Sequence, residues 1–335
     1  MKILVTGASG LLGGHVTRQL YEEGHTIRLF LRKTSGLKGL EGYYHEVVYG
    51  CLEDCEDVFK AVEGCDAVIH SASVTGTANT SLSYYEPANV HGTKHIVDAV
   101  LAYNVEKLVY VSTANCLGPG CKDNPGTERS LPCHFDLKSG YIDSKYIAQQ
   151  YVMKQVADKN LQAVVVNPTF IIGTHDYKPS SGQMILHGLK KIQLFPSGGK
   201  NFVPAIDAAR GVILALYKGK VGECYLLAGE NFTYKEFFDM LNNISGNKPL
   251  QIRLPKPLFN FMGLLGTMAG KLLGKHFSLN YCNTRVLSLE NYYSGSKARE
   301  QLGLKCTSVE NAIKETVEWF AAQNSPEPEV INTTK

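Results

Sequence analysis

The chain opens with Met1-Lys2-Ile3-Leu4-Val5-Thr6-Gly7-Ala8-Ser9-Gly10-Leu11-Leu12-Gly13-Gly14. Its apolar residues predict a buried strand, and the glycines that follow predict a tight turn into a helix. Free amide groups at the start of such a helix bind phosphate. A second strand, ending at Leu31, then completes a βαβ unit at the spacing of a dinucleotide-binding fingerprint. The alternative is a glycine-rich turn that binds no ligand.

Composition narrows the class of protein. With 335 residues, a formal net charge of +3, 44% hydrophobic and 19% charged residues, the chain is typical of a soluble globular protein without a nucleic-acid partner. The nine cysteines are odd in number and form no Cys-x-x-Cys pair, which argues against a disulfide framework and a metal site. We therefore expect a reducing, cytoplasmic compartment. No uncharged apolar run reaches about 18 residues, so we expect no transmembrane segment.

The first half of the chain alternates strand and helix patterns. Strands are predicted at 3–5, 27–31, 46–49, 67–70, 108–112 and 163–167, and helices at 11–21, 55–62, 88–103 and 142–156. This alternation predicts an α/β fold, a Rossmann doubly wound parallel sheet with helices on both faces. Ligands of such folds bind at the carboxyl ends of the strands.

The pattern changes in the second half and divides the chain. We expect a dinucleotide-binding domain at 1–173 with a returning segment at about 200–228, a smaller, mostly helical substrate-binding region at 174–199 and 229–322, and a disordered tail at 323–335. Two capping boxes predict helix starts: Thr233 with Glu236, for a helix ending near Gly246, and Thr307 with Glu310.

A tyrosine and a lysine, Tyr141 and Lys145, lie one helical turn apart and so share a helix face. A phenol has a pKa near 10, and a cation one turn away would lower that pKa toward neutrality. Such a pair is suited to proton transfer. The alternative is a solvated helix face. A preceding strand ends in hydroxyl residues, of which Thr113, or failing that Ser112, is suited to hold a substrate oxygen near Tyr141; capping of the next turn is the alternative role.

These motifs together resemble an extended short-chain dehydrogenase/reductase, of the NAD-dependent epimerase/dehydratase family. Segments 66–72, 89–93, 201–207 and 297–303 agree with that family, and the resemblance runs from Met1 to about Phe320. It implies hydride transfer to or from a nicotinamide. Tyr141 would be the catalytic acid/base, Lys145 would bind the nicotinamide ribose and tune Tyr141, and Thr113 would orient the reacting oxygen.

The resemblance also implies a set of cofactor-binding residues: Gly7, Ser9, Gly10, Leu11, Leu12, Gly13, Arg32, Lys33, Cys51, Leu52, Ser71, Ala72, Ser73, Asn89, Thr113, Tyr141, Lys145 and Pro168. Two segments depart from the family pattern. Gly50-Cys51-Leu52 replaces Gly-Asp-Leu, which shifts the adenine contact toward backbone groups. Asn167-Pro168 replaces Arg-Pro, and Phe170 stands where sugar-nucleotide epimerases usually have Asn.

The end of the second strand favours NADP(H) as cofactor. An acidic residue here usually binds the ribose of NAD, whereas arginine pairs with the 2′-phosphate of NADP. This strand is followed by Arg32 and Lys33 and no acid. A guanidinium binds phosphate with two hydrogen bonds. The alternative is that both cations are solvated turn residues.

Three features bear on the substrate class: the strand end Leu31-Arg32, the pair Asn167-Pro168 and the apolar stretch 257–273. Together they resemble the dihydroflavonol 4-reductase-like and 3β-hydroxysteroid dehydrogenase-like branch, which implies a ketone or secondary alcohol on a hydrophobic molecule of dihydroflavonol, steroid or ketoalkanoate type. The stretch could equally be core, a lid or a weak membrane-surface contact. A sugar-nucleotide epimerase/dehydratase and a non-catalytic NADP-binding scaffold are the alternative functions. Assembly into a homodimer stays open.

Overall fold

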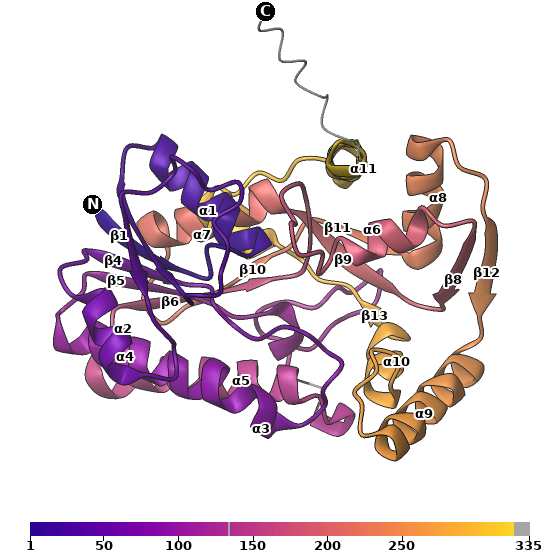
Figure 1. Ribbon diagram of the computed structural model, residues 1–335, viewed down its shortest axis with the longest axis horizontal. Coiled ribbons are helices and arrows are strands. Elements are labelled where there is room, and N and C mark those ends of the chain that lie inside the picture. The colour runs from indigo at the N-terminus through magenta and orange to yellow at the C-terminus, as the bar shows by residue number, and fades with distance from the viewer. Residues whose placement is uncertain (133–134, 325–335) are drawn as a thin grey trace, which may run out of the picture.

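The structure is a computed structural model that describes residues 1–132 and 135–324 (Figure 1). A seven-stranded sheet, with all neighbouring pairs parallel, has the order β10-β6-β5-β4-β1-β2-β3. Its strands are β1 (Lys2–Thr6), β2 (Thr26–Leu31), β3 (Glu46–Tyr49), β4 (Ala67–His70), β5 (Lys107–Val111), β6 (Ala163–Pro168) and β10 (Cys224–Leu227). The predicted doubly wound fold is confirmed.

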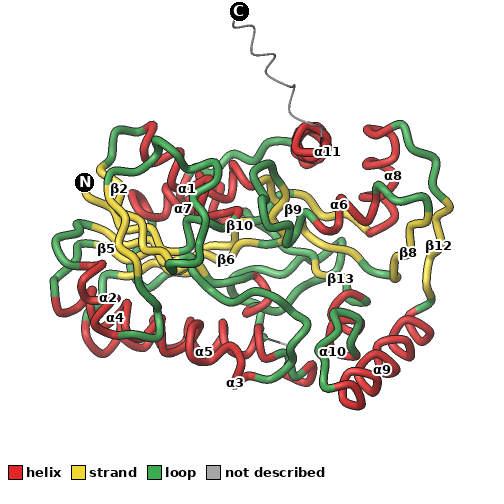
Figure 2. Tube along the Cα trace, in the orientation of Figure 1, coloured by secondary structure: helices red, strands yellow, loops and turns green. Residues whose placement is uncertain are grey.

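Helices cover both faces of the sheet because its strands are apolar on both sides. Ile3 and Val5 pack under α1 (Leu11–Glu22) and α7 (Ala205–Lys218), whereas Leu4 packs with α2 (Cys55–Val62), α4 (Gly92–Ala102) and α5 (Gly140–Lys159). Figure 2 shows these two helical layers with the strands between them. The predicted helix 88–103 in fact starts earlier, with α3 (Leu82–Tyr85) and a π-helical turn over Glu86–His91.

The C-terminal region contains more strand than predicted. A four-stranded sheet combines β7 (Phe170–Ile172), β9 (Gly199–Pro204), β11 (Glu230–Thr233) and β13 (Glu290–Asn291), and β8 (Ile192–Pro196) pairs with β12 (Leu250–Leu254). Its helices are α6 (Gln183–Gly188), α8 (Tyr234–Ser245), α9 (Lys256–Leu273), α10 (Tyr281–Leu287) and α11 (Val309–Asn324). Aromatic side chains fill this core, and the rings of Phe202 and Phe237 stack at 4.7 Å.

One of the two predicted capping boxes forms. Thr233 and Glu236 exchange hydrogen bonds of 2.8 and 3.1 Å at the start of α8, which ends at Gly246 with φ +69°. The second box is wrong, because the Thr307 hydroxyl donates to Asp207 at 2.8 Å. Helix α11 includes residues 323 and 324, so the predicted tail is wrong for these two; 325–335 lie outside the described residues. Within the described ranges, no helix is long and apolar enough to span a membrane.

Candidate active site

The glycine turn lies at the carboxyl end of β1 and cannot carry side chains. Gly7 has φ +74°, and a Cβ there would lie 2.7 Å from the Ala72 nitrogen. A Cβ on Gly13 would lie 2.7 Å from the Gly7 carbonyl carbon, so α1 packs directly on the turn. Gly10 caps α1 without a side-chain hydrogen bond. The first amides of α1, from Leu11 and Leu12 onward, therefore point into a cradle that suits a pyrophosphate.

Hydrogen bonds join the residues after β4 to the residues that form this cradle. The Ala72 amide donates to the Thr6 hydroxyl at 3.1 Å, and the Ser71 hydroxyl donates to the Thr6 carbonyl at 2.7 Å. His70 lies 2.8 Å from the same Thr6 hydroxyl, and burial lowers the pKa of its imidazole to about 3. A neutral His70 thus has a structural role, while Ser71 and Ala72 lie against the glycine turn; a contact of Ser73 with the cofactor stays a prediction.

The residues predicted to hold the adenosine end follow two neighbouring strands, β2 and β3. Arg32 and Lys33 are exposed in the turn after β2. Cys51 is also exposed, and its amide donates to Asp57 at 2.9 Å, whereas Leu52 is buried. Because β2 and β3 are paired and the Gly50 amide donates to the Leu31 carbonyl at 3.0 Å, the turn with Arg32 and Lys33 begins next to segment 50–52.

Lys145 is held inside the site by α5. It is 3% exposed, its Nζ donates to the Val111 carbonyl at 2.7 Å, and it lies 4.6 Å from the centre of the Tyr110 ring. Burial lowers the pKa of its ammonium to about 8. These contacts fix the lysine at the carboxyl end of β5.

Tyr141 lies in the first turn of α5, its ring centre 6.1 Å from that of Tyr85. Burial raises the pKa of its phenol, and a hydrogen bond with the Thr113 side chain opposes the rise. The prediction that Lys145 lowers this pKa is wrong for this arrangement, because the lysine contacts Val111 and Tyr110 and burial dominates. The phenol therefore keeps its proton at neutral pH and has one to donate, but this raised pKa makes it a weaker acid than a free phenol.

Of the two hydroxyls after β5, Thr113 faces the site and Ser112 does not. Ser112 donates to the Cys116 sulfur at 3.5 Å. Thr113 lines a pocket, and its carbonyl accepts a 2.9 Å hydrogen bond from Asn167, which also donates to Gln149 at 2.8 Å. Asn167, from the departure at the end of β6, thus braces the Thr113 backbone.

The Asn89 side chain connects two parts of the site by hydrogen bonds. Its Nδ2 donates to Ser144 at 2.9 Å and to the Val74 carbonyl at 3.1 Å, and its Oδ1 accepts from the Val74 amide at 2.7 Å. Ser144 precedes Lys145 on α5. Asn89 therefore ties the segment after β4 to the helix that carries the tyrosine and lysine, and its contact with a cofactor stays a prediction.

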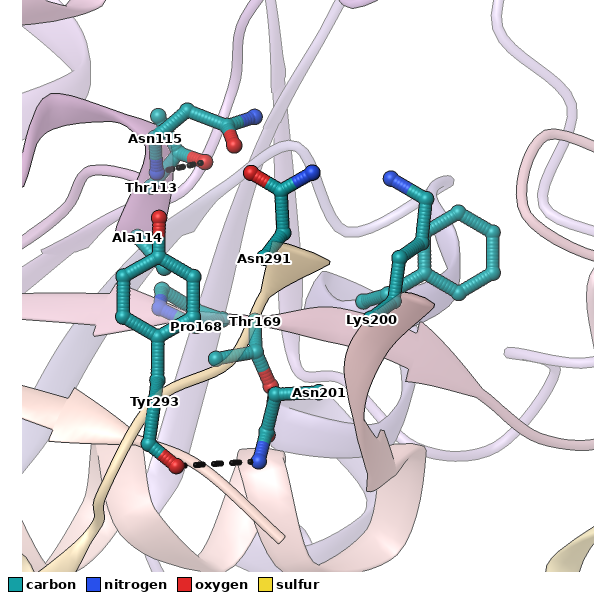
Figure 3. A pocket seen from close by; sticks show the side chains of 10 residues that line it. Thr113, Ala114, Asn115, Pro168, Thr169, Lys200, Asn201, Asn291 and Tyr293 are labelled. Atoms are coloured by element: carbon teal, nitrogen blue, oxygen red, sulfur yellow. Dashed lines mark hydrogen bonds between the residues drawn. The ribbon is translucent and has the colours of Figure 1, made fainter. Parts of the chain in front are cut away.

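Figure 3 shows the pocket beside Thr113, between the large sheet and the C-terminal region. Burial lowers the pKa of Lys200 to about 8, and its Nζ lies 5.2 Å from the centre of the Phe170 ring. Asn291 Oδ1 is a buried acceptor that has no partner among the described residues. Lining residues are Thr113, Ala114, Asn115, Pro168, Thr169, Phe170, Lys200, Asn201, Asn291 and Tyr293. None of these belongs to the apolar stretch 257–273.

Sequence reasoning missed Asn167, which hydrogen-bonds to the Thr113 carbonyl, and several polar lining residues, among them Asn115, Lys200 and Asn291. Asn167 and Asn115 carry a usable signal, since each lies within two residues of the carboxyl end of a buried strand or of Thr113. Lys200 and Asn291 carry none, because β9 and β13 reach the pocket only through long-range pairing. No group of three or more metal-ligating side chains occurs in the part of the chain that the structure describes.

A phosphate cradle and a tyrosine–lysine pair at one edge of a doubly wound sheet define a class of protein: an oxidoreductase that uses a nicotinamide dinucleotide. The chain belongs to the NAD dependent epimerase/dehydratase family, whose model matches residues 3–228, and within it to the extended short-chain dehydrogenases/reductases.

Similar proteins span the whole chain. A sterol demethylase protein B of Methylococcus capsulatus is 29% identical, covering 96% of this chain and 98% of that protein. A putative dihydroflavonol 4-reductase of Synechocystis is 28% identical, covering 94% and 93%. The protein gox2253 has 30% sequence identity to this chain. Its crystal structure superposes with a TM-score of 0.84, covering 97% of this chain and 98% of that one.

Proposed function

We propose that this protein is an NADP(H)-dependent oxidoreductase that interconverts a ketone and a secondary alcohol on a hydrophobic substrate. The observation that carries the proposal is the meeting of Thr113, Tyr141 and Lys145 at the carboxyl edge of the sheet, next to the pocket. A scaffold that only binds the nucleotide would not need a phenol hydrogen-bonded to the Thr113 hydroxyl beside this pocket.

The residues divide the chemistry of carbonyl reduction among them. A nicotinamide, when bound, supplies the hydride. Tyr141, kept protonated by burial, gives its phenolic proton to the carbonyl oxygen as that oxygen gains charge. The Thr113 hydroxyl donates to the same oxygen and orients it. Lys145, held by its hydrogen bond to the Val111 carbonyl, would bind the nucleotide ribose, and alcohol oxidation reverses the proton path.

The preference for NADP(H) rests on the charges after β2. Arg32 and Lys33 are exposed, and no hydrogen bond or ion pair is recorded for their side chains among the described residues. A 2′-phosphate would gain charge-assisted hydrogen bonds from such groups. We expect Arg32→Asp to weaken NADPH binding at least tenfold, a loss of about 1.4 kcal/mol, and to leave NADH binding nearly unchanged.

A matched control for the cofactor test is Lys154→Asp, which makes the same charge change on an exposed part of α5. That residue lies about 20 Å along the helix from Tyr141, at 1.5 Å per residue. Calorimetry would show NADPH and NADH binding unaltered in the control. Equal affinity of the unmutated protein for both cofactors would contradict the NADP(H) preference.

The hydrophobic substrate is supported by the names of two relatives, which refer to a sterol and a dihydroflavonol. The Phe170 ring on the pocket wall adds apolar surface, and burying it against a substrate is favourable at about 25 cal/mol per Å². Asn115, Asn291 and Lys200 would meet polar substituents of that substrate. A screen of ketones and alcohols with each cofactor, followed by the absorbance of reduced nicotinamide, tests this class.

A sugar-nucleotide epimerase or dehydratase is the second candidate, and Lys200 is the observation that favours it. A cation in the pocket could pair with a diphosphate. The aromatic wall at Phe170 opposes this, because a sugar's hydroxyls would lose hydrogen bonds against it. Stabilisation by UDP- or dTDP-sugars in a thermal-shift assay, without turnover of any apolar ketone, would establish the second candidate over the first.

A further inference from the structure

Helix α9 packs on the protein by one face only. That face carries glycines: a Cβ on Gly263 would lie 2.7 Å from the Thr284 methyl group, and a Cβ on Gly270 would lie 2.7 Å from the Lys275 carbonyl oxygen. The glycines let α9 approach α10 and the backbone of segment 275–279 closely. Figure 1 shows α9 at the outer edge of the C-terminal region, with α10 beside it.

The opposite face of α9 is apolar and exposed. Side chains spaced by three or four residues share one helix face, and five of them here are large, apolar and between 48% and 85% exposed. They are Leu258, Phe261, Leu265, Met268 and Leu272, and we call them the α9 apolar face. A continuous exposed apolar surface of this kind marks an interaction site. The sequence left core, lid and membrane contact open; the exposure excludes core, and the packing of α9 turns the face away from α10.

The chain segment that contains α9 carries charge of one sign only. Between Asp239 and Glu290 the chain contains no Asp or Glu. The cations of this segment are Lys248, Arg253, Lys256, Lys271, Lys275 and Arg285. Lys256 and Lys271 lie near the two ends of α9, and both are exposed, as is Lys275 just beyond the helix.

We propose that the α9 apolar face docks on an anionic phospholipid bilayer, with the helix lying in the plane of the interface. Amphipathic helices with a broad apolar face and flanking lysines bind membranes in this way, by burial of apolar area and attraction to anionic lipids. The lysine stems at both ends can extend toward the headgroups. A second copy of the chain fits less well, because it would bring two cationic segments together with no acid in them to pair.

The docking surface is connected to the active site through α10. Asn283 donates to the Thr77 carbonyl at 2.9 Å, and Asn280 donates to it at 3.3 Å. Thr77 belongs to the segment after β4 that Asn89 also holds. Helix α10 would thus separate a bilayer on the α9 apolar face from the segment after β4. Lipid binding itself does not depend on the proposed reaction.

The test is vesicle flotation with the full chain. We expect binding to vesicles of phosphatidylcholine with phosphatidylserine, reduced by added salt, and little binding to phosphatidylcholine alone. The double variant Phe261→Gln, Met268→Gln should lose at least tenfold in affinity while its thermal unfolding and turnover in solution stay unchanged. Val221→Gln, which alters an exposed apolar residue elsewhere, is the control.

A second variant separates charge from apolar burial. Lys271→Gln combined with Lys275→Gln should weaken binding to the anionic vesicles and make it less sensitive to salt. Equal flotation of the wild type and the Phe261, Met268 double variant would overturn the proposal. Self-association in sedimentation velocity that the same double variant abolishes, without any vesicle binding, would also overturn it by assigning the face to a second copy.

Discussion

Gly13→Ala should weaken cofactor binding at the glycine turn while the protein still folds. The added Cβ would lie 2.7 Å from the Gly7 carbonyl carbon and 3.0 Å from the Ala8 Cα. Non-bonded carbons rest at about 3.5–4.0 Å, so the turn and α1 must separate by roughly 1 Å. Both neighbours are backbone and cannot swing away. A phosphate held by amide groups of the turn and of α1 would lose a charge-assisted hydrogen bond. Such a bond is worth about 1.5–3 kcal/mol, which corresponds to roughly 10- to 100-fold weaker binding.

Gly14→Ala is the matched control, one residue further along the same helix. Its Cβ would lie 3.3 Å from the Ala8 carbonyl oxygen and 3.7 Å from the flexible Arg18 side chain. Alanine also favours a helix interior by up to about 1 kcal/mol over glycine. Calorimetric titration with NADPH, together with thermal unfolding, should show affinity kept in Gly14→Ala and lost in Gly13→Ala. Equal affinities of the two variants would refute the close-packing argument.

Three further variants test the pocket. Thr113→Val should lower turnover at least tenfold while Ser112→Ala changes it little, since only Thr113 faces the pocket; steady-state rates check this. Asn167→Ala should destabilise the fold by about 2–4 kcal/mol in urea unfolding, because two buried acceptors lose their donor. Lys200→Met should raise stability below pH 8 by about 1 kcal/mol, less than the full pKa shift implies, because Lys200 is only partly buried and solvent screens its charge. The Lys200 pKa is lowered to about 8 on folding, so the charged form is penalised, and this gain should fade as pH rises toward the unfolded pKa; a pH-independent gain would contradict it.

The elements that sequence predicts best are those with strong local patterns. Strands 46–49 and 67–70 and helix 55–62 have the predicted ends, because apolar runs and a capping Asp54 mark them. Local patterns do not predict the pairing of β8 with β12, since the two short strands lie more than fifty residues apart. The second capping box failed for a similar reason: Asp207, 100 residues away, takes the Thr307 hydroxyl.

The site shows the same division. The positions of Tyr141 and Lys145 on one helix follow from their spacing, but the environment of each does not. Which carbonyl Lys145 contacts, and how far burial raises the pKa of Tyr141, depend on β5 and on Tyr110 packed beside it. Motif spacing therefore locates reactive groups, and tertiary packing decides their protonation.

The most direct test of the account is Tyr141→Phe, which removes only the hydroxyl that the proposed reaction needs. Turnover of the best ketone from the screen should fall at least about 100-fold, while NADPH affinity measured by calorimetry stays within about threefold. Tyr151→Phe, on the same helix, should keep wild-type turnover. A Tyr141→Phe enzyme that retains more than about a tenth of the wild-type rate would contradict the assignment of Tyr141 as the proton donor.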